Sequence, residues 1–223
     1  MFQIKICGIT SAADGLCVAD AGADAVGLNF CPASPRHIEL GRAEEIVAAL
    51  PGGIARVGVF VNAPAAQVDQ IARRLRLDYV QLHGDEPPEY MAELAGLPVI
   101  RAFRGTSDFQ HVAAYLAACR TLGHAPVAVL IDAFQSGQYG GTGQSPDWSA
   151  VARARLAWAE MPLVLAGGLK PANVAAAIQQ VGPAAVDTAS GVERSPGRKA
   201  ADLVDQFVAA ARGAFDLKAN AKR

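Results

Sequence analysis

The stretch PLVLAGGLKPANVAAAIQQVGPAAVDTAS, residues 162–190, contains the pattern that decides the fold. Two short apolar runs begin at residues 162 and 184, and between them the apolar residues of 173–182 follow helical spacing. Because both runs are apolar almost without interruption, each is expected to be buried on both faces, as in a parallel sheet covered by helices. The stretch therefore predicts a strand, a helix and a second, parallel strand.

The same alternation extends over the whole chain. The apolar runs are QIKIC (3–7), AVGLNF (25–30), ARVGVFV (55–61), YVQLH (79–83), PVIRAF (98–103), AVLIDA (128–133), PLVLAGG (162–168) and AAVDTAS (184–190). Segments with helical spacing separate them, and Ser11 and Asp147 stand where helix N-caps are expected. Eight repeats predict a single-domain (β/α)8 barrel, the TIM-barrel fold, over residues 1–215, with a disordered basic tail at 216–223. A doubly wound open sheet is the alternative, but its GxGxxG turn after the first strand is missing.

Composition narrows the possible partners. The formal net charge is −1 and the basic residues are scattered apart from the short tail, which argues against nucleic acid and favours a small-molecule substrate. No apolar run is long enough to span a bilayer, and the first residues lack the pattern of a signal peptide, so we expect a cytoplasmic protein with no membrane partner. The four cysteines form no CxxC pair, which argues against a zinc site and against a disulfide framework.

Cys7 ends the first predicted strand and shares a face with Lys5, two residues earlier. A lysine near a thiol favours the thiolate, which is the form that acts as a base or a nucleophile. Packing in the core is the alternative reading of Cys7, and its position alone does not decide between the two.

Asp132 ends the sixth predicted strand, behind a run of Val, Leu and Ile. Apolar neighbours favour the protonated carboxyl group, which can act as a general acid; capping a loop is the structural alternative. His83 ends the fourth strand, but the other histidines do not fall at matching strand ends, so no metal site is expected.

Two glycine-containing loops follow the last two strands. In barrels of this kind these loops commonly bind phosphate, which makes Gly167, Gly168, Ser190 and Gly191 candidates, although glycines also simply permit tight turns. The polar stretch after Asp132 contains GGTG at 140–143 and resembles a loop over the barrel mouth. Arg36 could bind a carboxylate with its planar guanidinium. The alternative is that Arg36 is an ordinary surface arginine, and Arg101 is expected to be one as well.

Seven segments together carry a resemblance to a known family. KICGIT, GLNF followed by SPR, VGVFVN, VQLHGDE, GGTG, LAGGL and VDTASGVE occur in order along the chain and resemble the phosphoribosylanthranilate isomerases of tryptophan biosynthesis. The resemblance implies a cofactor-free Amadori rearrangement of N-(5-phosphoribosyl)anthranilate to 1-(2-carboxyphenylamino)-1-deoxyribulose 5-phosphate.

The resemblance also assigns roles to residues of this chain. It implies that Cys7 is the general base and Asp132 the general acid. It places Arg36 at the anthranilate carboxylate and Asp187 at the sugar region, with His83 as a further substrate-binding residue. It assigns the phosphate to the loops containing Gly141, Gly143, Gly167, Gly168, Ser190 and Gly191.

Rival functions share the predicted barrel. Another phosphosugar enzyme is possible, such as an epimerase, a lyase or an aldolase that forms a Schiff base on Lys5. A barrel that binds phosphosugars without catalysis is a further alternative, because fold does not fix function. Oligomeric state is not visible in the sequence, and a monomer is the mild preference.

Overall fold

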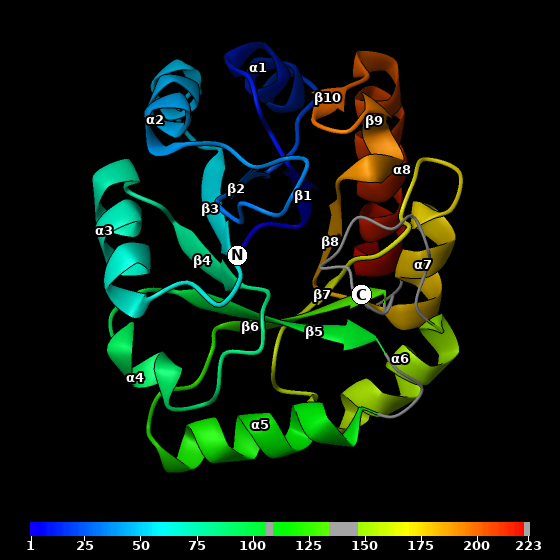
Figure 1. The fold of residues 1–223 in the computed structure, drawn as a ribbon. Coiled ribbons are helices and arrows are strands. Elements are labelled where there is room, and N and C mark those ends of the chain that lie inside the picture. Colours follow the sequence, from blue (N-terminus) through cyan, green and yellow to red (C-terminus); the bar gives the residue numbers. More distant parts are fainter. Residues whose placement is uncertain (106–108, 134–146, 221–223) are drawn as a thin grey trace.

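The structure is a computed structural model that describes residues 1–105, 109–133 and 147–220. Eight parallel strands close into a barrel in sequence order, and helices surround them (Figure 1). The barrel strands are β1 (Ile4–Cys7), β2 (Ala25–Asn29), β3 (Ala55–Phe60), β4 (Tyr79–Leu82), β5 (Val99–Gly105), β6 (Ala128–Ala133), β7 (Leu163–Leu165) and β8 (Ala185–Thr188). β1 pairs with both β2 and β8, which closes the sheet and confirms the predicted (β/α)8 fold.

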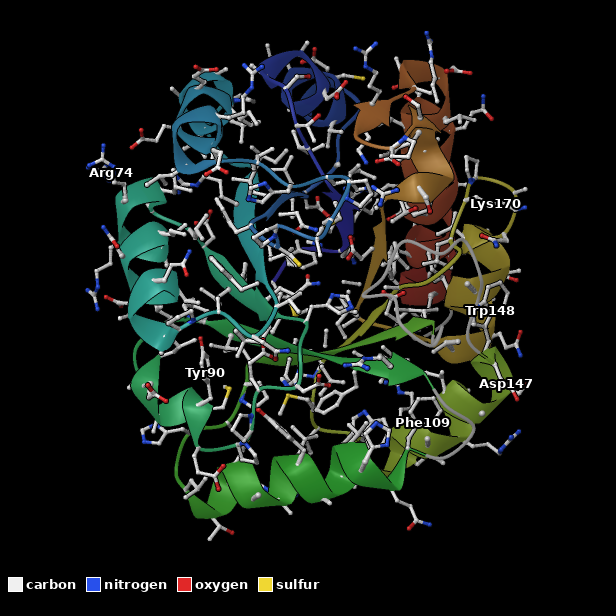
Figure 2. The ribbon with its side chains drawn as sticks, in the orientation of Figure 1. Arg74, Tyr90, Phe109, Asp147, Trp148 and Lys170 are labelled. Carbon is white, nitrogen blue, oxygen red and sulfur yellow. The ribbon has the colours of Figure 1, made fainter. Side chains whose placement is uncertain are left out.

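Helices follow the strands as the alternating pattern predicts. They are α1 (Ala12–Asp20), α2 (Leu40–Ala49), α3 (Ala65–Leu75), α4 (Tyr90–Glu93), α5 (Gln110–Thr121), α6 (Trp148–Ala154), α7 (Val174–Val181) and α8 (Ala201–Asn220), with 3-10 turns η1 (Arg155–Trp158) and η2 (Ser190–Val192). Ser11 caps α1 by accepting a hydrogen bond from the Asp14 backbone. Asp147 caps α6 by accepting from the amides of Ser149 and Ala150, and its side chain lies at the start of that helix in Figure 2. Both predicted N-caps are confirmed.

Two apolar cores account for the nearly continuous hydrophobic strands. The larger one lies between the strands and the helices, and the smaller one contains strand residues such as Val57, Ile100, Leu130 and Val164. In most strands, successive side chains join one core and then the other, which removes both faces from water; in β1, Lys5 and Cys7, which alternate with Ile4 and Ile6, belong to neither core. This packed scaffold fixes the strand ends from which the candidate site is built.

The C-terminal region differs from the prediction in two ways. Helix α8 continues to Asn220, five residues past the expected boundary at residue 215, because Phe215 and Ala214 are buried against the barrel and the helix has no breaker after them. A small antiparallel hairpin, β9 (Glu193–Ser195) and β10 (Arg198–Lys199), follows η2 and was not expected. No helix in the described part of the chain is long and apolar enough to cross a membrane.

Candidate active site

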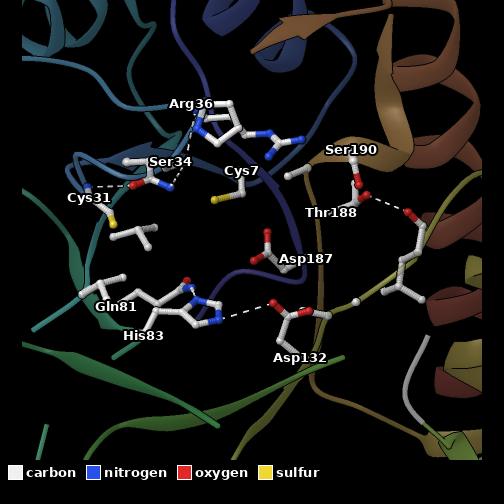
Figure 3. Close-up of a pocket in the computed structure, with 18 of the residues that line it drawn as sticks. Cys7, Cys31, Ser34, Arg36, Gln81, His83, Asp132, Asp187, Thr188 and Ser190 are labelled. Atoms are coloured by element: carbon white, nitrogen blue, oxygen red, sulfur yellow. Dashed lines mark hydrogen bonds and ion pairs between the residues drawn. The ribbon is translucent and has the colours of Figure 1, made fainter. Parts of the chain in front are cut away.

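A cavity of about 360 Å³ opens at the carboxyl ends of the strands, where active sites of this fold lie. Its walls include eight of the predicted site residues: Cys7, Arg36, His83, Asp132, Gly167, Gly168, Asp187 and Ser190. In Figure 3 the side chains of Cys7, Asp132 and Asp187 point toward the same space. The fold thus brings residues from the ends of six strands, or from the loops that follow them, into one site.

Three predicted residues are not among those that form this wall. Gly141 and Gly143 lie outside the described residues. Gly191 packs behind the wall, because a Cβ atom there would come within 1.8 Å of the Leu169 carbonyl oxygen. Gly191 therefore allows the two candidate phosphate loops to approach each other closely.

Cys7 occupies the end of β1, and its thiol faces the cavity beside Gly27. A Cβ atom on Gly27 would lie 2.6 Å from the sulfur, so this glycine in β2 leaves room for the thiol. Burial raises the pKa of the Cys7 thiol above its ordinary value, and the positive charges of Lys5 and Lys199 oppose this without outweighing it. Lys5 favours the thiolate as expected, but the protonated thiol remains the stable form in the unliganded protein.

Lys5 lies below Cys7 and forms a buried ion pair. Its Nζ atom is 2.8 Å from Oδ2 of Asp187, and the Lys5 side chain is 0% exposed. Burial is the largest influence on Lys5 and by itself would lower its pKa, but the charges of Asp187 and Cys7 and the hydrogen bonds to both together outweigh burial and raise that pKa. A lysine held as an ammonium ion cannot attack a carbonyl, so the geometry disfavours the Schiff-base aldolase.

Asp187, at the end of β8, has one oxygen committed and one available. Oδ2 accepts from Lys5, whereas Oδ1 is buried and has no hydrogen-bond partner among the described residues. Burial and the negative charge of Asp132 raise the pKa of Asp187 more than Lys5 and His83 lower it. A buried acceptor without a partner at a cavity wall is suited to a ligand hydroxyl group.

His83 links Asp132 to a residue that the sequence analysis did not select. The Nε2 atom of His83 is 3.3 Å from Oδ2 of Asp132, as the dashed line in Figure 3 marks. Its other ring nitrogen, Nδ1, lies 3.0 Å from Nε2 of Gln81. Because an amide nitrogen can only donate, Nδ1 accepts from Gln81 and the ring proton is on Nε2, which lies close to the Asp132 carboxyl group but forms no hydrogen bond among the described residues. Gln81 thus selects the tautomer that serves Asp132.

Arg36 comes from the loop after β2, whose shape depends on local hydrogen bonds. Asn29 donates to Ser34 Oγ, and the same hydroxyl oxygen accepts from the Arg36 backbone amide. The guanidinium of Arg36 meets Glu193 of β9, with Nε 2.9 Å from Oε1 and Nη2 2.7 Å from Oε2. Gly8 has a left-handed φ of 74°, and a Cβ atom there would lie 2.4 Å from Cδ of Arg36. Glycine at this position therefore lets the arginine cross the end of β1.

The loops after β7 and β8 are joined by hydrogen bonds. Gly167 and Gly168 have left-handed φ values of 86° and 61°, which glycine adopts without strain. Thr188 Oγ1 donates to the Leu169 carbonyl oxygen at 2.7 Å, and Asn173 Nδ2 donates to that of Gly168 at 3.0 Å. These bonds hold the glycine turn against Ser190 at the cavity edge, an arrangement suited to binding an anion through backbone amides.

Arg101 is not the surface residue that the sequence suggested. It is 4% exposed, and its guanidinium donates to the carbonyl oxygens of Leu82 and Gly84 at 3.0 and 3.1 Å. Oε2 of the buried Glu86 lies 3.3 Å from Arg101 Nη1. The arginine is buried because it satisfies the carbonyl groups of the loop that follows His83, so its role is to fix that loop.

Within the described residues, no group of three or more His, Cys, Asp and Glu side chains gathers as a metal ion would require. The arrangement instead offers a carboxyl group, a thiol, an arginine and a glycine-lined loop pair around one cavity. These groups can hold a phosphorylated, carboxylated substrate and transfer protons to and from it.

Comparison with known proteins identifies relatives that cover nearly the whole chain. The family model of N-(5′-phosphoribosyl)anthranilate (PRA) isomerase matches residues 4–210. The N-(5′-phosphoribosyl)anthranilate isomerase of Rubrobacter xylanophilus is 45% identical over 218 residues, which cover 95% of this chain and 100% of the relative. The crystal structure of phosphoribosyl anthranilate isomerase from Thermotoga maritima superimposes with a TM-score of 0.84 at 38% identity, covering 96% of this chain and 100% of that one.

A further similar crystal structure contains a bound ligand. It is a phosphoribosyl anthranilate isomerase in complex with reduced 1-(o-carboxyphenylamino)-1-deoxyribulose 5-phosphate. It is 38% identical with a TM-score of 0.81, and the match covers 96% of this chain and 100% of that chain.

Proposed function

Because the chain belongs to the N-(5′-phosphoribosyl)anthranilate isomerase family, we propose that Cys7 and Asp132 transfer the protons of its Amadori rearrangement. The enzyme converts N-(5-phosphoribosyl)anthranilate into 1-(2-carboxyphenylamino)-1-deoxyribulose 5-phosphate in tryptophan biosynthesis. The observation that supports the assignment of roles is the placement of a thiol and a carboxyl group on the wall of one cavity.

Asp132 begins the reaction as the general acid. It delivers a proton to the furanose ring oxygen, the bond from this oxygen to C1 breaks, and an iminium ion forms between C1 and the anthranilate nitrogen. His83, whose Nε2 atom is 3.3 Å from Asp132, orients the carboxyl group. Gln81 in turn orients His83, so the three side chains form a chain of contacts leading to the acid.

Cys7 completes the rearrangement as the general base. The iminium ion acidifies the C2–H bond, and the thiolate removes this proton to leave an enolamine, which relaxes to the ketone. Burial raises the pKa of the Cys7 thiol, so the thiolate needs support in the transition state. The cationic iminium provides it, because a positive charge next to the sulfur favours the ionised form.

The remaining side chains bind the substrate at its two ends. Arg36 binds the anthranilate carboxylate, and the backbone amides of the loops at Gly168 and Ser190 bind the phosphate. Asp187, through its unpartnered Oδ1 atom, accepts a hydrogen bond from a sugar hydroxyl group. Binding both ends holds the sugar between the acid and the base, where proton transfer is fastest.

The test is an assay that follows the fluorescence of phosphoribosylanthranilate as it is consumed, without added metal or cofactor. Cys7→Ala and Asp132→Asn are each expected to lower kcat by about a hundredfold or more, with little change in melting temperature. Cys17→Ala, which removes a thiol from the outer helix α1, is the matched control and keeps wild-type activity. Full activity in either site variant would show that the role assigned to that residue is wrong.

Two further expectations stay predictions. A cytoplasmic location is supported by the four free cysteines, which suit a reducing compartment. The monomeric state predicted from the sequence can be tested by light scattering of the purified enzyme.

A further inference from the structure

Glu193 and Lys199, on the hairpin β9–β10, stand behind Arg36 and belong to no predicted role. On one side, Glu193 accepts hydrogen bonds from Nε and Nη2 of the Arg36 guanidinium. On the other side, Nζ of Lys199 lies 2.7 Å from Oε1 of Glu193. The side chains of Glu193 and Lys199 are 3% and 0% exposed. A carboxylate therefore lies buried between two cations at the edge of the cavity.

The protonation state of Lys199 follows from its hydrogen bonds. Its Nζ atom donates to the carbonyl oxygens of Cys7 and Ala189, at 2.6 and 3.2 Å, as well as to Glu193. Three acceptors require three N–H groups, which only the ammonium form has. Burial lowers the pKa of Lys199 below its ordinary value, and the charge and hydrogen bond of Glu193 reduce this shift without cancelling it. Arg36, Glu193 and Lys199 together carry a formal charge of plus one.

This charge matters because Arg36 and Glu193 alone would form a neutral pair with little attraction for an anion. Glu193 occupies Nε–H and one hydrogen of Nη2, which is the side-on edge of the guanidinium. The hydrogens of Nη1 and the second hydrogen of Nη2 form the remaining edge. Arg36 lines the cavity, and among the described residues its Nη1 atom forms no hydrogen bond. A planar carboxylate can accept two hydrogen bonds from that edge.

We propose that Glu193 and Lys199 are positioning residues that determine specificity for a substrate with an aromatic carboxylate. Glu193 fixes the Arg36 guanidinium in one orientation, and Lys199 supplies the charge that Glu193 would otherwise cancel. Lys199 also bonds the Cys7 carbonyl oxygen, so the carboxylate site and the base-bearing strand are joined. The inference rests on the proposed role of Arg36 and adds the two residues that make it effective.

The experiment compares two substrates that differ only in the carboxylate. N-(5-phosphoribosyl)anthranilate and N-(5-phosphoribosyl)aniline can both be formed from ribose 5-phosphate and the corresponding amine. If a variant displaces Cys7, the turnover of both substrates falls to the same extent. The ratio of their kcat/KM values therefore reports only the effect on binding of the carboxylate. Lys199→Met is expected to reduce the preference for the anthranilate substrate by about tenfold. Arg198→Met removes an exposed charge from the same hairpin and should leave the ratio unchanged.

A double variant separates charge from structure. Glu193→Gln combined with Lys199→Met removes one negative and one positive charge, so Arg36 again gives a net charge of plus one. If charge decides specificity, the double variant regains much of the preference that Lys199→Met loses. Equal losses for both substrates in Lys199→Met, or a double variant that is less selective than Lys199→Met, would overturn the inference. Thermal unfolding of each variant verifies that the compared proteins are folded.

Arg36→Met distinguishes failure of this inference from failure of the proposed function. If Arg36→Met leaves the ratio of kcat/KM values unchanged, Arg36 does not bind the carboxylate, and the proposed substrate orientation is wrong. If Arg36→Met lowers the ratio but Lys199→Met does not, Arg36 keeps its role, and only the role of the hairpin residues is refuted.

Discussion

Replacing Lys5 by methionine would leave the carboxylate of Asp187 buried without its cation. In the wild-type protein the two charged atoms are 2.8 Å apart, and the side chains are 0% and 8% exposed. Oδ1 of Asp187 has no hydrogen-bond partner among the described residues, so Lys5 provides the main compensation for this charge. Methionine has a similar length and fills the same space without a charge.

The size of the effect can be worked out from this geometry. At an effective dielectric constant of about 20, unit charges 2.8 Å apart attract each other by about 6 kcal/mol, which is an upper bound for the pair. Removing one partner of a buried ion pair costs about 3–5 kcal/mol in measured cases. We therefore expect Lys5→Met to lower the free energy of unfolding at neutral pH by about 3–5 kcal/mol.

The pH dependence has a definite sign. Burial already raises the pKa of Asp187 above 3.8, and loss of Lys5 raises it further. A carboxyl group with a raised pKa in the folded state contributes stability below its unfolded pKa, and this contribution is lost as pH rises through the folded pKa. The deficit of Lys5→Met relative to wild type is thus small in acid and grows toward neutral pH.

Urea unfolding followed by tryptophan fluorescence at several pH values measures this deficit. Lys5→Met combined with Asp187→Asn removes both charges and should recover a large part of the stability. A deficit below about 1 kcal/mol at neutral pH, or one that is the same at every pH, would refute the reasoning.

Three further predictions concern the candidate site. Gln81→Leu should lower kcat by about tenfold with little change in KM, because His83 loses the partner that fixes its tautomer; an unchanged kcat in steady-state assays would contradict this. The kcat/KM of the wild-type enzyme should still rise above neutral pH, because burial raises the pKa of the Cys7 thiol, and a profile that is already flat there would argue against a thiolate base. Gly27→Ala should lower kcat by about tenfold or more, because the new methyl group would lie 2.6 Å from the Cys7 sulfur; wild-type turnover would show that the thiol tolerates displacement.

Much of the fold and part of the site follow from position in the sequence. Cys7, Asp132 and Asp187 each end an apolar run, and the carboxyl ends of parallel strands must meet at one mouth of a barrel. Gln81 could have been found by the same reasoning, since it lies two residues before His83 and therefore on the same face of the strand. The sequence signal for Gln81 was a polar side chain inside the otherwise apolar run YVQL.

The hairpin residues were less accessible to such reasoning. Strands β9 and β10 have three and two residues, which is too short for a periodic pattern. Glu193 stood inside a recognised motif, but nothing in the sequence indicated that its partner would be Arg36, which is 157 residues away along the chain. Lys199 reads as an ordinary surface lysine, because only the folded structure brings its ammonium group beside the Cys7 carbonyl oxygen.

The bond between Lys199 and the strand of Cys7 joins the last part of the chain to the first. The thiol and the guanidinium come from the amino-terminal half, whereas the acid, the glycine turns and the hairpin come from the carboxyl-terminal half. Neither half alone has a complete set of reacting groups. If the two halves were expressed separately and mixed, catalytic turnover would appear only where they associate. Enzyme activity would therefore measure the assembly of the barrel from its halves.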